Sequence, residues 1–114
     1  YSQAIKTPGL VFTAGQLGLD PASGEFAGAD VAAQTSQAMK NLRAVLEEAG
    51  SGLEHIVKTT IFVVDLAYFK IVNEVYGSFF GGEGGVPPAR STVQVAALPL
   101  GGLVEIEAVA VIES

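Results

Sequence analysis

The sequence predicts an α+β domain in which a mixed β-sheet carries two helices packed on one face. Three observations lead to this prediction: two segments space their apolar residues as amphipathic helices do, several short segments are rich in β-branched residues, and glycine or proline separates them. The expected order of elements is β-β-α-β-α-β-β. With 114 residues, the chain fits a single domain, 1–114, which is large enough to bury a hydrophobic core.

The N-terminal segments predict a β-hairpin followed by a loop. Two short strand-like stretches, 2–7 and 10–16, are joined by Pro8-Gly9, a dipeptide typical of turns. Residues 18–29 are expected to form a loop, because their Asp-Pro-Ala-Ser-Gly stretch supplies the backbone angles that tight turns need.

Two helices are expected, each with its own boundary signals. The first covers about 31–49, begins after the N-cap residue Asp30 and ends at Gly50. The second begins after Asp65, carries a wide apolar stripe and ends at the glycine-rich stretch 81–85.

Three further strands complete the predicted sheet, over about 56–64, 91–98 and 103–112. Because side chains in a strand alternate between two faces, Glu105 and Glu107 share one face of an otherwise apolar strand. Two interpretations are open: a solvated strand end, or a glutamate that lines a site and pairs with a cation or holds a water. Buried charge is costly without such a partner.

The composition excludes several classes of protein. The net charge is −6 and the six basic residues are scattered along the chain, which disfavours nucleic-acid binding. No uninterrupted apolar run approaches the about 20 residues that span a bilayer, and no signal peptide is recognisable. The absence of cysteine fits a reducing compartment, so we expect a cytoplasmic protein. Apolar residues make up 49% of the chain and charged residues only 16%, which predicts that another subunit covers part of the surface.

Two features that resemble functional motifs have simpler interpretations. The single histidine, His55, stands at the start of a strand without a nearby partner, so we interpret it as an ordinary strand-end residue. The stretches Gly-Gln-Leu-Gly and Gly-Gly-Glu-Gly-Gly lack the spacing and the strand–helix context of nucleotide-binding loops, and we interpret both as turns.

Arg90 is one of only two arginines, and it follows Pro87-Pro88 at the entrance to a predicted strand. A guanidinium group matches a carboxylate with two parallel hydrogen bonds. The residues alone leave two alternatives open for Arg90: a structural ion pair with Glu105 or Glu107, or a clamp for a small carboxylate ligand.

Motifs along the whole chain resemble the RidA/YjgF family, also called reactive intermediate deaminase A. The resemblance rests on VFTAGQLG, DVAAQTSQAMKNLRAVLEEAG, PPARSTVQVAALP and VEIEAVAVI, which follow one another in this order. It implies a chorismate-mutase-like fold and a homotrimer whose sheets form a barrel-like centre. It also implies three clefts at the subunit interfaces, each lined by residues from two neighbouring chains.

The same resemblance implies an activity. RidA-type proteins hydrolyse 2-imino acids and their enamine tautomers, such as 2-iminopropanoate and 2-iminobutanoate, to 2-keto acids and ammonia. They thereby remove reactive intermediates released by pyridoxal-phosphate enzymes. The reaction implies no cofactor and no metal. The implied partners are small imino-acid carboxylates and further copies of the chain, with no nucleic acid and no membrane.

Carried over by position, the resemblance assigns the chemistry to three residues. Arg90 clamps the substrate carboxylate. Glu105 holds the attacking water and shuttles its proton. The backbone carbonyl of Thr92 accepts a second hydrogen from that water, whereas Glu107 is expected to be structural.

The resemblance also implies a set of substrate-binding residues. The backbone of Ala14 and Gly15 lines the carboxylate end of the cleft, and Tyr1 and Asn73 close it. The chain departs from the common pattern in two places: many members carry serine where it has Ala14 and cysteine where it has Thr92. The first change removes a hydroxyl from the cleft, and the second removes a thiol but keeps the carbonyl.

Two alternatives to this imine deaminase are open. One is a family paralogue that acts on another imine, such as an aminoacrylate. The other is a non-enzymatic chaperone or regulatory protein.

Overall fold

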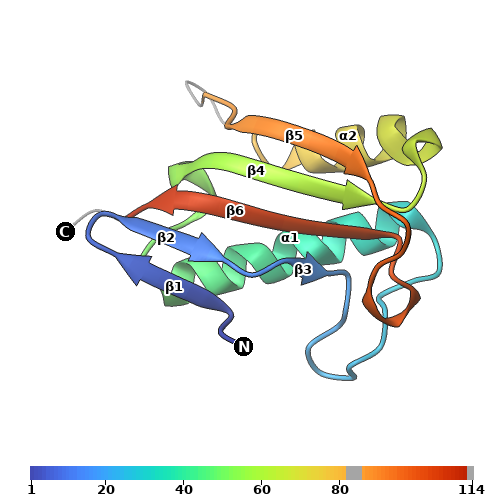
Figure 1. Cartoon of the computed structure of the whole chain (residues 1–114), viewed down its shortest axis with the longest axis horizontal. Helices are drawn as coiled ribbons and strands as arrows, with labels where there is room; N and C mark the ends of the chain where they lie inside the picture. Colours follow the sequence, from blue (N-terminus) through green and yellow to red (C-terminus); the bar gives the residue numbers. More distant parts are fainter. Residues whose placement is uncertain (82–85, 113–114) are drawn as a thin grey trace.

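The computed structural model of the chain describes residues 1–81 and 86–112 (Figure 1). The predicted glycine-rich turn at 81–85 therefore lies outside the described residues, apart from Gly81. The helices and strands are β1 (Ala4–Thr7), β2 (Leu10–Thr13), β3 (Gln16–Leu17), α1 (Val31–Glu48), β4 (Ile56–Val63), α2 (Phe69–Ser78), β5 (Ala89–Gln94) and β6 (Val104–Val111).

One mixed sheet organises the molecule. Its strands lie in the order β1-β2-β6-β4-β5, and the short strand β3 pairs with β6 beyond the end of β2. The pair β4–β5 is parallel and all other pairs are antiparallel. Figure 1 shows β6 and β4 in the middle of the sheet, with β1 and β5 at its two edges.

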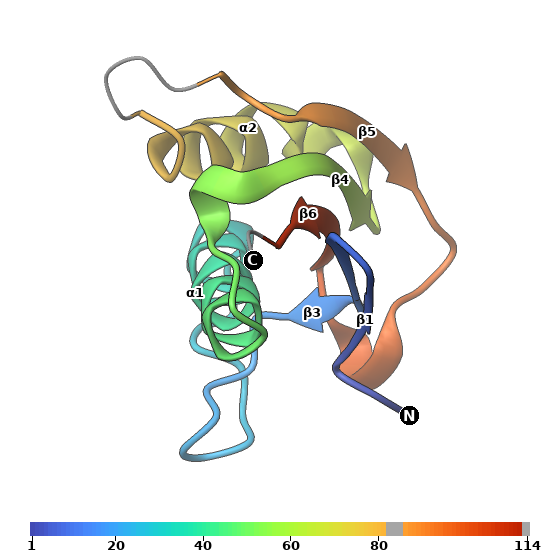
Figure 2. The same cartoon turned by 90° about the vertical axis from the view of Figure 1, so that its left-hand side faces the viewer.

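Both helices lie on the same side of the sheet, as the sequence predicts (Figure 2). Asp30 caps α1, since its carboxylate accepts a hydrogen bond of 3.1 Å from the backbone N–H of Ala33. The apolar stripe of α1 buries Ala38, Met39 and Leu42 against the sheet. The α+β class with two helices on a mixed sheet is therefore confirmed.

The opposite face of the sheet carries no helix among the described residues. Its side chains include Ile5, Phe12 and Val93, which are 56%, 44% and 42% exposed. Each belongs to a different strand, and Ile5 stands directly across from Phe12. We call this surface the open face. The open face is more apolar than a sheet face that is exposed only to solvent.

Three element boundaries differ from the sequence prediction. The second N-terminal strand breaks at Ala14-Gly15, so that β3 forms a separate strand of two residues. Asp65 caps a short 3₁₀ helix, Leu66–Tyr68, and α2 starts only after it. Strand β5 covers Ala89–Gln94 rather than 91–98, because its parallel pairing with β4 ends where β4 ends.

Candidate functional site

Arg90 lies on edge strand β5 and is held by side chains of α2. Its guanidinium donates a hydrogen bond to Oδ1 of Asn73. The guanidinium carbon also lies 5.5 Å from the ring centre of Phe69 and 5.2 Å from that of Tyr76. Neutral amide and aromatic partners orient the cation through hydrogen bonding and cation–π attraction without neutralising it. The arginine therefore keeps its charge for a ligand.

The second aromatic partner of Arg90 is anchored in the core. The hydroxyl groups of Tyr76 and Thr59 lie 2.7 Å apart and form a buried hydrogen bond. Burial raises the pKa of Tyr76, while its hydrogen bond with Thr59 and the charge of Arg90 oppose that rise. Tyr76 thus stays neutral and presents a fixed ring to the guanidinium.

A cleft of about 410 Å³ opens beside Arg90. Its volume falls in the range of small-molecule sites. The cleft is lined by Asn73, Tyr76, Gly77, Phe80, Pro87, Pro88 and Arg90. This arrangement offers one positive charge beside aromatic rings, two prolines and a polar amide, which suits a small organic anion.

Glu105 stands on central strand β6, in the open face. Burial raises the pKa of Glu105 above its ordinary value, and the negative charge of Glu107 raises it further. The two carboxylates share a face because they are two positions apart on one strand. Glu105 therefore binds and releases a proton closer to neutral pH than an exposed glutamate does.

Arg90 and Glu105 lie on opposite faces of the sheet. Arg90 on β5 is paired with Thr59 on β4, and Thr59 is paired with Ala108 on β6. These three residues therefore share the helix-covered face. Glu105 is an odd number of positions from Ala108 along β6, which turns its side chain to the other face. The ion pair between Arg90 and either glutamate, one of the two alternatives left by the sequence, does not form in this chain.

Thr92 lies two positions after Arg90 on the same edge strand. The N–H of Val95 donates to the carbonyl of Val63 on β4, and peptide groups alternate in direction along a strand. The carbonyl of Thr92 consequently points away from β4, toward the unpaired edge of the sheet. It is available as an acceptor whatever side chain position 92 carries.

The remaining predicted site residues gather near β3. Tyr1 and Gly15 line one groove of about 330 Å³, together with residues of α1. Ala14 precedes Gly15 at the break between β2 and β3, and its N–H donates to the carbonyl of Gln3. The predicted residues thus form two clusters. The arginine cluster is Arg90, Thr92 and Asn73; the glutamate cluster is Glu105 and Gly15, with Ala14 next to Gly15 in the chain and Tyr1 in the groove that Gly15 also lines.

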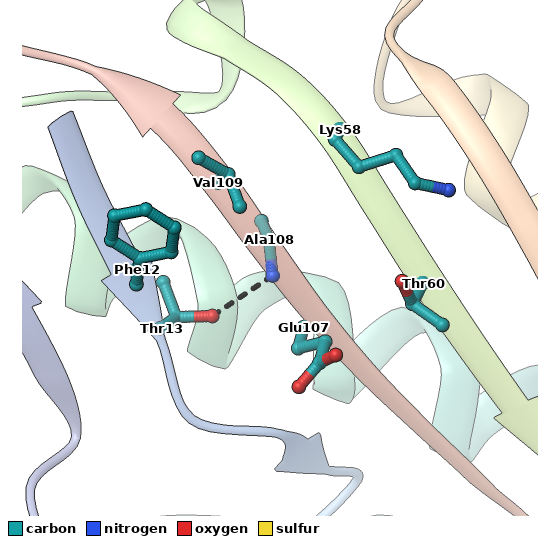
Figure 3. Close-up of a pocket in the computed structure, with 7 residues that line it drawn as sticks. All are labelled: Phe12, Thr13, Lys58, Thr60, Glu107, Ala108 and Val109. Carbon is teal, nitrogen blue, oxygen red and sulfur yellow. Dashed lines mark hydrogen bonds between the residues drawn. The ribbon is translucent and has the colours of Figure 1, made fainter.

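Glu107 faces a separate small cavity in the open face, of about 110 Å³ (Figure 3). Figure 3 shows Glu107 beside Thr60, whereas the Lys58 side chain extends toward β5. Nζ of Lys58 donates a hydrogen bond of 2.7 Å to the hydroxyl of Ser91 on β5. Glu107 therefore has no ion-pair partner among the described residues, and it acts on Glu105 as a neighbouring negative charge.

His55 lies in a short 3₁₀ turn immediately before β4, with Nε2 3.5 Å from a carboxylate oxygen of Glu54. The strand-end position is the one that the sequence predicts, but the prediction that His55 lacks a nearby partner is wrong, because the adjacent Glu54 supplies a carboxylate. In residues 1–81 and 86–112, no group of three histidine or acidic side chains could hold a metal ion. No described helix is long and apolar enough to cross a membrane.

The fold and the two clusters define a small α+β protein that displays a cation and a partly buried carboxylate on opposite faces of one sheet. A family model described as endoribonuclease L-PSP matches residues 1–112. The chain belongs to this family, which is the RidA/YjgF family that the sequence motifs resemble.

Named relatives and solved structures agree with this membership. The chain is 45% identical over 111 residues to the 2-iminobutanoate/2-iminopropanoate deaminase of Mus musculus, covering 97% of this chain and 80% of the relative. It is 50% identical to the chloroplastic Reactive Intermediate Deaminase A of Arabidopsis thaliana, covering 96% and 57%. The crystal structure of the E. coli YjgF gene product matches with a TM-score of 0.93 and 44% identity, covering 99% and 88%.

Sequence reasoning missed the two aromatic partners of Arg90. Phe69 and Tyr76 belong to the apolar stripe from which the sequence predicts the second helix. They are seven positions apart, two helical turns, which places them on one side of α2. That spacing was visible in the sequence, but nothing local indicated that an arginine would lie between them.

Proposed function

We propose that this protein hydrolyses small 2-imino acids, such as 2-iminopropanoate and 2-iminobutanoate, to 2-keto acids and ammonia. The observation that carries the proposal is Arg90: a guanidinium at an open cleft, oriented by Asn73 and two aromatic rings, with no carboxylate beside it in residues 1–81 and 86–112. Such a group binds a substrate carboxylate through paired hydrogen bonds. The deaminase names of the mouse and plant relatives give the substrate class its support.

The proposed chemistry divides between the two clusters. Arg90 holds the carboxylate of the imino acid. Glu105, in its ionised form, accepts a proton from a water molecule whose other hydrogen is bound by the carbonyl of Thr92. The water oxygen adds to the C=N carbon, and the imine nitrogen receives the proton. In the resulting carbinolamine, the hydroxyl proton passes through Glu105 to the amino nitrogen, the C–N bond breaks, and the C=O bond of the 2-keto acid forms as ammonia leaves.

Such a site requires two chains. Since Arg90 and Glu105 lie on opposite faces of one sheet, they cannot approach the same substrate within one copy. We therefore propose a homotrimer in which the arginine cluster of one chain faces the glutamate cluster of the next. The exposed apolar side chains of the open face and the unpaired edge of β5 support association of this kind.

The direct test follows imine decay after the purified protein is added to a dehydratase that releases 2-iminobutanoate. Wild type is expected to accelerate decay and Arg90→Ala to lose that acceleration. An Arg90→Ala variant as active as wild type contradicts the mechanism. Comparing imines with larger side chains separates this reaction from that of a paralogue with another substrate.

Mixed assemblies test the two-chain site. Arg90→Ala and Glu105→Gln chains are each expected to be inactive, and co-assembly should restore activity. Random mixing in a closed ring of three pairs an intact Arg90 with an intact Glu105 at about one boundary in four, so about a quarter of wild-type activity is expected. No recovery in verified mixed trimers would place both residues of a site in one chain.

RNA cleavage is the competing activity, because the family description names an endoribonuclease. A net charge of −6 disfavours RNA binding, which depends on neutralising phosphates. Incubation with single-stranded RNA, with Arg90→Ala as the comparison, decides the point: cleavage that survives Arg90→Ala would point to a different site.

A further inference from the structure

Gly15 and Glu105 are 90 positions apart in the sequence and touch in the fold. If Gly15 carried a Cβ atom, that atom would lie 2.5 Å from Cδ and 2.8 Å from Cγ of Glu105, and its three nearest neighbours would all belong to this one side chain. Real Cβ atoms do not approach other heavy atoms so closely. The Glu105 carboxyl group therefore occupies the space that any other residue at position 15 would fill.

The strand geometry explains this contact. Leu17 of β3 is paired with Glu105, and Gln16 with Ile106, so Gly15 lies diagonally across from Glu105. The side chain of Glu105 leans along its strand onto this diagonal neighbour. A diagonal contact is normally made between two side chains, but here one partner is bare backbone.

The break between β2 and β3 is held open from both sides. The hydroxyl of Thr13 accepts a hydrogen bond from the N–H of Ala108, in place of a backbone carbonyl. The N–H of Ala14 turns toward β1 and donates to Gln3 at 2.8 Å. Farther along, Asn41 of α1 donates to the carbonyls of Leu17 and Leu19, which fixes β3. Gly15 is thus placed against β6 by contacts on either side of it.

Backbone conformation does not demand glycine at this position. Gly9, Gly24, Gly50 and Gly101 have positive φ angles, whereas Gly15 is not among the residues of that kind. An alanine at position 15 could adopt the same backbone angles, so a substitution there tests side-chain space alone.

We propose that Gly15 is a positioning residue: its missing side chain makes the space in which the Glu105 carboxylate is held for proton transfer. This inference rests on the proposed hydrolysis and assigns to Gly15 a role besides the backbone contact to substrate that the family resemblance implies. The displaced group is the end of a flexible side chain, so Gly15→Ala should disturb the carboxylate far more than the fold.

The experiment is a double-mutant cycle with Gly15→Ala and Glu105→Asp, measured by imine hydrolysis. Gly15→Ala alone should lower kcat at least tenfold, with KM and the melting temperature nearly unchanged. In the Glu105→Asp background, whose side chain is one methylene shorter, Gly15→Ala should cost less than threefold. Gly81→Ala is the matched control, since a Cβ at Gly81 meets no atom of the described residues within 4 Å, and it should keep wild-type kcat.

A second readout keeps the inference testable if the protein proves not to be an imine deaminase. NMR titration of the Glu105 side-chain carbon reports its pKa without any substrate. Gly15→Ala should move that pKa toward the ordinary glutamate value as the carboxyl group is pushed into solvent, and Gly81→Ala should not. Equal losses from Gly15→Ala in both backgrounds, or an unchanged Glu105 pKa, would overturn the inference. If the wild-type protein does not hydrolyse imines, but Gly15→Ala changes the pKa of Glu105 as expected, only the proposed function is overturned.

Discussion

The arginine cluster and the glutamate cluster hold their charged groups by different means. Arg90 lies on an edge strand and is oriented by side chains of a neighbouring helix, Asn73, Phe69 and Tyr76. Glu105 lies on a central strand and is oriented by strand register and by the space left at Gly15. One cluster stabilises its charge with neutral partners, and the other penalises its charge by burial and a like-charged neighbour. In the proposed mechanism, this difference assigns substrate binding to the arginine cluster and proton transfer to the glutamate cluster.

The largest effects should therefore differ in kind between the two clusters. We expect Glu105→Gln to lower kcat by roughly 100-fold or more while KM changes little, because proton transfer contributes about 10²–10⁴ in rate. Arg90→Lys should chiefly raise KM, since lysine keeps the charge but loses the paired hydrogen bonds. Steady-state kinetics of both variants check the division, which fails if both change the same parameter.

The aromatic anchor of the arginine cluster should matter for stability. Tyr76→Phe leaves the fully buried Thr59 hydroxyl without its partner, which should cost about 1–3 kcal/mol of unfolding free energy. Thr59→Val added to Tyr76→Phe should recover much of that loss, since neither polar group remains. Urea denaturation of the single and double variants measures both values. Additive losses would show that the hydrogen bond is not the source of the effect.

The like-charged neighbour of Glu105 should set the pH dependence of activity. Because Glu107 raises the pKa of Glu105, Glu107→Gln should lower it, and the ionised base should persist to more acidic pH. The acidic limb of the profile of kcat/KM against pH should shift toward lower pH. Glu48→Gln, an exposed position on α1, removes the same charge and serves as the control. A pH profile identical to that of wild type would show that Glu107 does not set the pKa of Glu105.

The smallest effect should come from Thr92. Its proposed contribution is a backbone carbonyl at the free edge of β5, so Thr92→Ala should change kcat/KM by less than about threefold, well under the loss from a missing catalytic group. Thr92→Cys, the residue common at this position in the family, should behave in the same way. A large loss in either variant would show that the Thr92 side chain, rather than its backbone carbonyl, contributes to catalysis.

Local patterns predicted the elements of this fold well. Apolar spacing identified both helices, and the Asp30 cap and strand alternation on β6 appear in the structure as predicted. Strand β3 escaped prediction because two residues carry no periodicity. The end of β5 was misplaced because parallel pairing with β4, rather than its own composition, decides where it stops.

The candidate site was only partly accessible from the sequence. Motifs predicted Arg90 and Glu105 as site residues through a family resemblance, and strand alternation placed Glu105 beside Glu107 on one face of β6. The sequence could not exclude an ion pair between Arg90 and a glutamate. The structure excludes it within one chain, because the registers of β5, β4 and β6 turn the two charges to opposite faces.

The sequence by itself determined which segments form helices and strands and which side of each segment is apolar, because those properties depend on spacings of a few residues. The tertiary structure alone decided which distant segments meet. It set Glu105 against Gly15 and Arg90 against Tyr76, and it separated the two charged groups by a sheet. These relations depend on strand order and register, which arise from packing the whole chain and leave no periodic trace in any one segment.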